Sequence, residues 1–207
     1  MSSESSVDRP PAEAGRPSAV EPTVKLERRV SPFFGFIFYG FLFAVAWVWL
    51  QAGAIDVRAL WTPRNLALEL AVGIGAGVLL AGATPWFVRA VPVCRELERE
   101  FGWILGEQRA WECLYLAILS GVAEEFFFRG ALHQAVGPWL GLVVFAALHW
   151  PVNGQFAAWP FTALVAGVVL TAERMWTGTL VAPVATHIIV NAVNLLRISR
   201  KYRVWKE

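Results

Sequence analysis

The stretch 121–130 reads GVAEEFFFRG, and it places Glu124, Glu125 and Arg129 inside an otherwise apolar segment that spans about residues 112–133. A charged side chain at the centre of a membrane helix costs about 3 kcal/mol on insertion scales. Glu125 and Arg129 are four residues apart with the acid first, the better order for an intrahelical ion pair. Because Glu124 points about 100° away around the same helix, we expect it to face a different neighbour.

The composition around this stretch is that of a membrane protein. Of 207 residues, 57% are hydrophobic and 16% are charged, which is well above the apolar share of a soluble domain. Several of the 11 tryptophans lie at the edges of apolar runs, where the indole ring suits the headgroup region of a bilayer. The formal net charge of +2 is too small to indicate nucleic-acid binding. Cys94 and Cys113 lack a metal-type spacing and are expected to be reduced.

Apolar stretches of spanning or near-spanning length define the expected fold. They occur at about 33–55, 66–88, 112–133, 138–150, 157–172 and 178–198, against about 20 helical residues needed for one crossing. We therefore predict an all-α fold, a polytopic integral membrane helical bundle of about six transmembrane helices. The fourth helix is expected to be short, because it stops at Pro151.

The same pattern predicts the domain organisation. A disordered N-terminal tail is expected over 1–30, a transmembrane helical domain over 31–198 with its functional core at 112–198, and a basic C-terminal tail over 199–207. In the second helix, Gly73, Gly75 and Gly77 are expected to permit a close approach of another helix.

The basic residues predict the orientation of the chain. They form three clusters, one before the first apolar stretch, one in 89–110 and one after the last stretch: Lys25, Arg28, Arg29; Arg89, Arg95, Arg99, Arg109; Arg197, Arg200, Lys201, Arg203, Lys206. All three clusters are cytoplasmic if both termini are cytoplasmic. The segment 89–110 also has the pattern of an interfacial amphipathic helix that begins near Pro92. The alanine- and arginine-rich composition indicates a bacterial inner (plasma) membrane.

Two further pairs of residues share helix faces at membrane depth. Phe145 and His149 in the fourth segment are separated by four residues, as are His187 and Asn191 in the sixth. Counted at 1.5 Å per residue from the nearest loops on one side of the membrane, Glu124, His149 and His187 all lie about 14–16 Å deep. Their common depth on three separate helices predicts that they meet.

Such a set of side chains fits hydrolysis without a covalent nucleophile. A carboxylate and an imidazole can polarise a water molecule, while a second imidazole and a carboxamide donate hydrogen bonds to an oxyanion. Zinc is the alternative, held by Glu124, His149 and His187 with one open position. Because no His-Glu-x-x-His pairing is present, we expect no cofactor and keep zinc as the competing interpretation.

Three motifs in order carry a family resemblance. They are Glu124-Glu125-x-x-x-Arg129, Phe145-x-x-x-His149 and His187-x-x-x-Asn191, each on its own apolar helix. This pattern resembles that of the CPBP family, the CAAX-protease and bacteriocin-processing (Abi-type) group that includes type II CAAX prenyl endopeptidases. The resemblance covers about residues 112–198.

The resemblance implies a role for each of these residues. Glu124 and His149 would activate the water molecule, and His187 with Asn191 would form the oxyanion site. The protein would then be an intramembrane endopeptidase that cuts a peptide bond near the C-terminal end of a membrane-associated or lipidated protein. Its partners would be that protein or peptide substrate, with a membrane-proximal C-terminal tail, and the lipid bilayer.

The other residues of the motifs are expected to support this site. Glu125 and Arg129 would hold the third helix in place, and Phe128, Phe145 and Asn194 would line the cavity. Two other functions stay open. A scaffold or immunity protein of the same fold would bind a membrane partner without catalysis. A proton-coupled transporter is disfavoured because six helices without an internal inverted repeat suit alternating access poorly.

Overall fold

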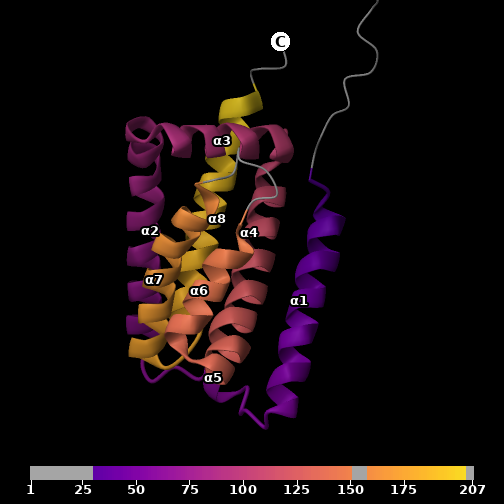
Figure 1. The fold of residues 1–207 in the computed structure, drawn as a ribbon, viewed down its shortest axis with the longest axis vertical. Helices are drawn as coiled ribbons and strands as arrows, with labels where there is room; N and C mark the ends of the chain where they lie inside the picture. The colour runs from indigo at the N-terminus through magenta and orange to yellow at the C-terminus, as the bar shows by residue number, and fades with distance from the viewer. Residues whose placement is uncertain (1–29, 151–157, 204–207) are drawn as a thin grey trace, which may run out of the picture.

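The computed structural model describes residues 30–150 and 158–203, and every regular element within those ranges is helical. In chain order the elements of Figure 1 are α1 (Pro32–Ala52), η1 (Ala59–Trp61), α2 (Leu66–Ala90), α3 (Pro92–Leu105), α4 (Ala110–Glu125), η2 (Phe126–Leu132), α5 (His133–Val136), α6 (Pro138–Leu148), α7 (Trp159–Thr177) and α8 (Val181–Arg203).

These elements confirm the predicted all-helical membrane bundle. Each of the six apolar stretches is helical, and α4, η2 and α5 follow one another without a break to form the third. Of the described helices, α1, α2 and α8 are long and apolar enough to cross a membrane by length and composition, and α6 is a shorter apolar helix. The predicted interfacial helix is α3, which begins at Pro92 as expected.

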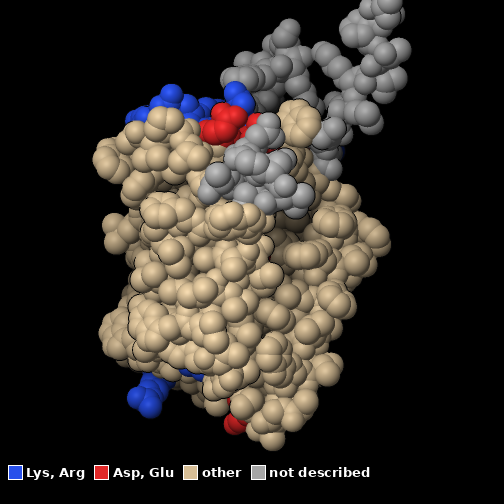
Figure 2. All heavy atoms as spheres, in the orientation of Figure 1, with Lys and Arg blue, Asp and Glu red and all other residues tan. Residues whose placement is uncertain are grey.

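The charged residues visible on the surface lie at the two ends of the bundle. In Figure 1, α3 lies across the end at which α8 terminates, while η1 and α5 lie at the opposite end. Figure 2 shows most of the visible Lys, Arg, Asp and Glu side chains at the α3 end and a few at the other end, with a broad uncharged band between them. That distribution fits a protein whose middle contacts lipid tails and whose ends contact headgroups and water.

Helix α8 packs in the centre of the bundle against α2, α4 and α7. A Cβ atom on Gly73 of α2 would lie 2.4 Å from the Ala182 carbonyl oxygen, and one on Gly77 would lie 2.8 Å from Ile189 Cβ. These two glycines therefore allow the close approach that the sequence predicted. Gly75 faces open space, so the prediction was wrong for this residue.

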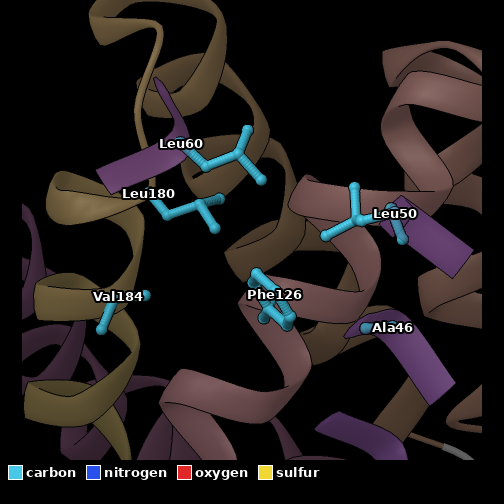
Figure 3. Packing of buried hydrophobic residues seen from close by; sticks show 7 residues of the cluster. Ala46, Leu50, Leu60, Phe126, Leu180 and Val184 are labelled. Atoms are coloured by element: carbon cyan, nitrogen blue, oxygen red, sulfur yellow. The ribbon is translucent and has the colours of Figure 1, made fainter. Parts of the chain in front are cut away.

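A second packing region joins α1, the η1 loop and the start of α8 (Figure 3). The Leu180 backbone N–H donates to the Leu60 carbonyl oxygen at 2.8 Å, and Phe126 is completely buried between them and α1. The buried members of this cluster are Ala46, Leu50, Leu60, Phe126, Ala131, Leu180 and Val184. The cluster stabilises the end of α4 from which the charged motif projects.

The C-terminal boundary differs from the prediction. Helix α8 continues through Arg203, so the predicted boundary at 198/199 lies inside the helix. The reason is tertiary contact: the Gln108 backbone N–H donates to Ser199 Oγ at 2.9 Å, and Lys201 Nζ donates to Glu98 Oε1 of α3 at 2.6 Å. The predicted tail over 1–30, apart from residue 30, and the predicted stop at Pro151 lie outside the described residues.

Candidate active site

The two adjacent glutamates of α4 face different neighbours, as the helical geometry predicted. Glu125 is completely buried, and its Oε1 accepts hydrogen bonds from Arg129 Nη1 at 3.0 Å and from His187 Nδ1 at 2.7 Å. The Glu125–Arg129 ion pair is therefore confirmed, while the bond to His187 is an addition that the sequence did not predict. Arg129 also donates to the Gly167 carbonyl oxygen at 3.3 Å and lies 4.2 Å from the centroid of the Phe145 ring.

Directly after Glu125 the helix widens into the π-helix η2, which contains Arg129. Arg174 Nε of α7 donates to the Arg129 carbonyl oxygen at 3.3 Å. A π-helical turn changes which backbone groups pair along the helix, and such turns occur often at functional sites. The consequence here is that α7 stabilises both the guanidinium and the backbone of Arg129.

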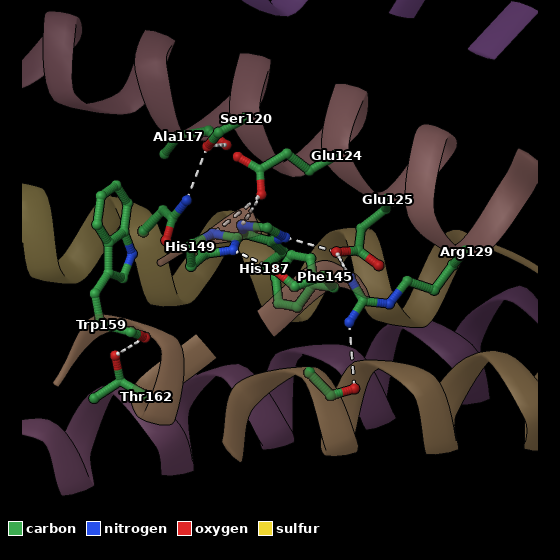
Figure 4. A network of polar contacts seen from close by, with 12 residues as sticks. Ala117, Ser120, Glu124, Glu125, Arg129, Phe145, His149, Trp159, Thr162 and His187 are labelled. Carbon is green, nitrogen blue, oxygen red and sulfur yellow. Dashed lines mark hydrogen bonds and ion pairs between the residues drawn. The ribbon is translucent and has the colours of Figure 1, made fainter. Parts of the chain in front are cut away.

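Glu124 lies opposite the two histidines (Figure 4). Its Oε2 is 4.0 Å from His149 Nε2 and 4.0 Å from His187 Nε2. The three side chains come from α4, the end of α6 and α8, which confirms that they meet. Because 4.0 Å exceeds hydrogen-bond length, the groups converge on one small volume without bonding directly to each other.

The hydrogen bond made by each Nδ1 atom orients the ring of that histidine. His149 Nδ1 lies 2.7 Å from the Phe145 carbonyl oxygen, which can only accept, so Nδ1 carries the proton. In the neutral ring, His149 Nε2 is then an acceptor directed at Glu124. His187 Nδ1 bonds to the Glu125 carboxylate, which leaves His187 Nε2 directed at the same Glu124 oxygen.

Asn191 lies one turn beyond His187 and is held by α4. Its Nδ2 donates to Ser120 Oγ at 2.8 Å, and Ser120 Oγ in turn donates to the Ala117 carbonyl oxygen. Tyr39 of α1 contacts both Ser120 and Glu124. Ser120 and Tyr39 were not predicted, because one serine and one tyrosine in apolar helices carry no motif.

A largely apolar cavity of about 330 Å³ reaches the predicted site between α2, α3, α7 and α8. His149, His187 and Asn191 line it, and so do Phe145 and Asn194, as predicted. Phe128 does not line it. That prediction was wrong, because Phe128 packs edge-on against Phe145 at 4.9 Å between ring centroids, in a buried cluster with Leu132 and Ala163.

The distances within this site do not match those between the ligands of a zinc ion. Two ligands of a tetrahedral zinc ion lie about 3.3 Å apart, given bonds of about 2.0 Å. Glu124 lies 4.0 Å from each histidine, so the set as placed is too wide. Among the described residues no group of three or more His, Cys, Asp or Glu side chains has a geometry that could hold a metal ion.

A second buried acid, which the sequence did not predict, lies near the site. Glu173 of α7 is 5% exposed, and its Oε1 lies 2.7 Å from Thr186 Oγ1, the residue before His187. The apolar stretch was predicted to end at 172, which placed Glu173 in a loop. Helix α7 continues to Thr177 because Glu173 and Arg174 find buried partners on neighbouring helices.

Fold and site together define a polytopic membrane protein with an ionisable cluster, drawn from three helices, at the depth of the bilayer interior. The family model "Type II CAAX prenyl endopeptidase Rce1-like" matches residues 106–193. The "Uncharacterized protein YpbD" of Bacillus subtilis (strain 168) is 29% identical over 143 residues, which cover 67% of this chain and 72% of the relative. These two comparisons support the assignment of the chain to the CAAX protease (CPBP) family. No solved structure matches it.

Proposed function

We propose that the protein is an intramembrane endopeptidase that hydrolyses a peptide bond near the C-terminal end of a membrane-associated or lipidated protein. Membership of a family named for CAAX endopeptidases supports protease activity in general. The observation that carries the specific proposal is the convergence of Glu124, His149 and His187 at 4.0 Å, next to an apolar cavity.

In this proposal a water molecule binds between Glu124 and His149. Glu124, with the acceptor Nε2 of neutral His149, removes a proton from the water as its oxygen attacks the scissile carbonyl carbon. The proton then passes to the leaving amine. Because water is the nucleophile, no covalent bond forms between the enzyme and the substrate.

His187 and Asn191 would stabilise the oxyanion that forms on the carbonyl oxygen. For His187 Nε2 to donate, the ring must carry protons on both nitrogens, and the Glu125 carboxylate accepts the proton on Nδ1. Asn191 uses one N–H for Ser120 and has a second for the oxyanion. Glu125 and Arg129 would support this arrangement without contacting the substrate.

Comparison of membrane proteomes from cells that produce the wild type or the Glu124→Ala variant tests the proposal. We expect one membrane protein to keep an uncut C-terminal tail in the variant, measured by mass spectrometry of C-terminal peptides. The control is Glu96→Ala, which removes an exposed acid of α3. A purified Glu124→Ala protein that cuts the identified substrate at the wild-type rate would contradict the assignment. Membrane proteomes without any difference in a C-terminal tail would instead favour a scaffold or immunity protein.

We also propose that no metal takes part in the reaction. Activity that survives prolonged treatment with a chelator would support this mechanism. Loss of activity that zinc restores would assign Glu124, His149 and His187 as zinc ligands instead.

The proposed location is a bacterial inner (plasma) membrane with both termini in the cytoplasm. The basic residues of α3 and of the end of α8 lie at one end of the bundle, which supports this orientation (Figures 1 and 2). Reporter fusions after residue 207 and within the loop around Arg64 test it, since only the first should report a cytoplasmic position.

A further inference from the structure

Thr186 of α8, directly before His187, has more hydrogen-bond contacts than its single proton can serve. Its Oγ1 lies 2.9 Å from the Gly73 carbonyl oxygen of α2 and 2.7 Å from Glu173 Oε1 of α7. The hydroxyl is completely buried. The Gly73 carbonyl oxygen and an ionised carboxylate can both only accept, so with Glu173 ionised the single Thr186 proton serves just one of the two contacts.

Both contacts are hydrogen bonds at the same time only if Glu173 carries a proton, which it donates to Thr186 Oγ1 while Thr186 donates to Gly73. Two carboxylate oxygens of an ionised Glu173 would only accept, and Thr186 has no second proton to give. The other oxygen, Glu173 Oε2, is buried without a hydrogen-bond partner among the described residues. An ionised carboxylate with one unpartnered oxygen would be costly at this depth, whereas a neutral acid leaves only a carbonyl oxygen unpaired.

The neighbouring charges also favour a neutral Glu173. Glu173 lies within electrostatic range of Glu125 and Arg129. The Arg129 guanidinium pairs with Glu125 at 3.0 Å, and the same Glu125 oxygen holds His187 Nδ1. A second anion at Glu173 would compete for Arg129 and repel Glu125. A neutral Glu173 leaves the Arg129–Glu125–His187 chain undisturbed.

We propose that Glu173 is a neutral carboxylic acid that donates its proton to Thr186 and thereby positions His187. The chain of bonds runs from Glu173 of α7 through Thr186 of α8 to the Gly73 carbonyl oxygen of α2. It fixes the backbone of α8 one residue before the histidine. Glu173 is a positioning residue that does not touch the reacting atoms, and its effect on cleavage rests on the function proposed above.

Infrared difference spectroscopy on the full-length protein in detergent at neutral pH tests the protonation state directly. Carboxylic acid and carboxylate groups absorb in separate regions. We expect the wild-type minus Glu173→Gln spectrum to show a protonated carboxyl carbonyl band. The matched control is Glu96→Gln, an exposed acid paired with Arg99, which should show carboxylate bands instead. Carboxylate bands in the Glu173 difference spectrum would overturn the proposal.

The effect on His187 is measured with two variants of Glu173. Glutamine can donate its N–H to Thr186, so Glu173→Gln should keep cleavage within about threefold, while Glu173→Leu should lower kcat by about tenfold or more. The ¹⁵N signals of the His187 ring should stay in place in the first variant and move in the second. Combined with Thr186→Val, Glu173→Leu should add little further loss, because both variants remove the same bond.

These results separate the two proposals. If Glu124→Ala cleaves normally, the proposed role of Glu124 fails, and if no substrate is cut, the proposed function fails; in both cases the infrared band and the His187 ring signals still decide the state of Glu173. If Glu173→Gln moves the His187 signals as far as Glu173→Leu does, Glu173 does not position His187, whether or not the protein is a protease.

Discussion

Replacement of Glu125 by glutamine should destabilise the protein strongly, although the change is nearly isosteric. Glu125 is completely buried and Arg129 is 2% exposed, so the variant leaves a buried guanidinium without its carboxylate. Removal of one partner of a buried ion pair costs about 3–5 kcal/mol. Arg129 keeps the Gly167 carbonyl oxygen at 3.3 Å and the face of the Phe145 ring. We therefore expect the lower part of that range, about 3 kcal/mol.

Thermal unfolding in detergent, followed by tryptophan fluorescence, measures this loss. For a chain of this length about 3 kcal/mol corresponds to a Tm lower by roughly 6–12 °C. The matched control is Glu124→Gln on the neighbouring residue. Its carboxylate is 14% exposed and 4.0 Å from each histidine, so its replacement should change the free energy of unfolding by less than about 1 kcal/mol.

A third variant shows whether the unpaired Arg129 guanidinium causes the loss of stability. The double substitution Glu125→Gln with Arg129→Met removes both charges and should recover a large part of the lost stability, because no unpaired guanidinium remains. A single Glu125→Gln variant as stable as the wild type would refute the reasoning. Equal losses in the single and double variants would also refute it, since they would place the cost elsewhere.

Two other predictions use matched pairs of neighbours. Gly73→Ala should lower the free energy of unfolding by about 1–3 kcal/mol, because the new Cβ would lie 2.4 Å from the Ala182 carbonyl oxygen; Gly75→Ala, which faces open space, should be neutral in the same thermal assay. Asn191→Ala should lower kcat by about 10²–10³ if its second N–H binds the oxyanion. Asn194→Ala, one turn further along the cavity, should change kcat by less than about tenfold, and equal losses would contradict the role of Asn191.

The sequence predicted the helices well because one physical constraint dominates them. A segment in lipid must satisfy its backbone groups internally, so apolar runs of spanning length become helices. The meeting of Glu124, His149 and His187 followed from a second constraint, since charged and polar groups at one depth are too costly to lie apart from each other. Both arguments use only chain length and residue type.

What the sequence could not predict depends on contacts between distant segments. The π-helix around Arg129 coincides with a hydrogen bond from Arg174, 45 residues away. The extension of α8 beyond residue 198 depends on Ser199 and Lys201 meeting partners near α3. Glu173 was assigned to a loop because an apolar run ends before it, although the helix continues. In each case a polar residue was tolerated inside the bundle because a partner from another helix was present.

Under the proposed mechanism, the adjacent glutamates explain how one polar cluster can be both stable and reactive. Glu125 is completely buried and holds Arg129 and His187 within 3.0 Å, so it belongs to the packed framework. Glu124, about 100° around the same helix, stays partly exposed and meets the histidines only at 4.0 Å. A carboxylate locked into direct ion pairs would be a poor base, whereas one held near two imidazoles by a neighbouring framework can exchange a proton. In the proposed mechanism the two acids therefore have separate roles, since Glu125 stabilises the geometry in which Glu124 acts as the base.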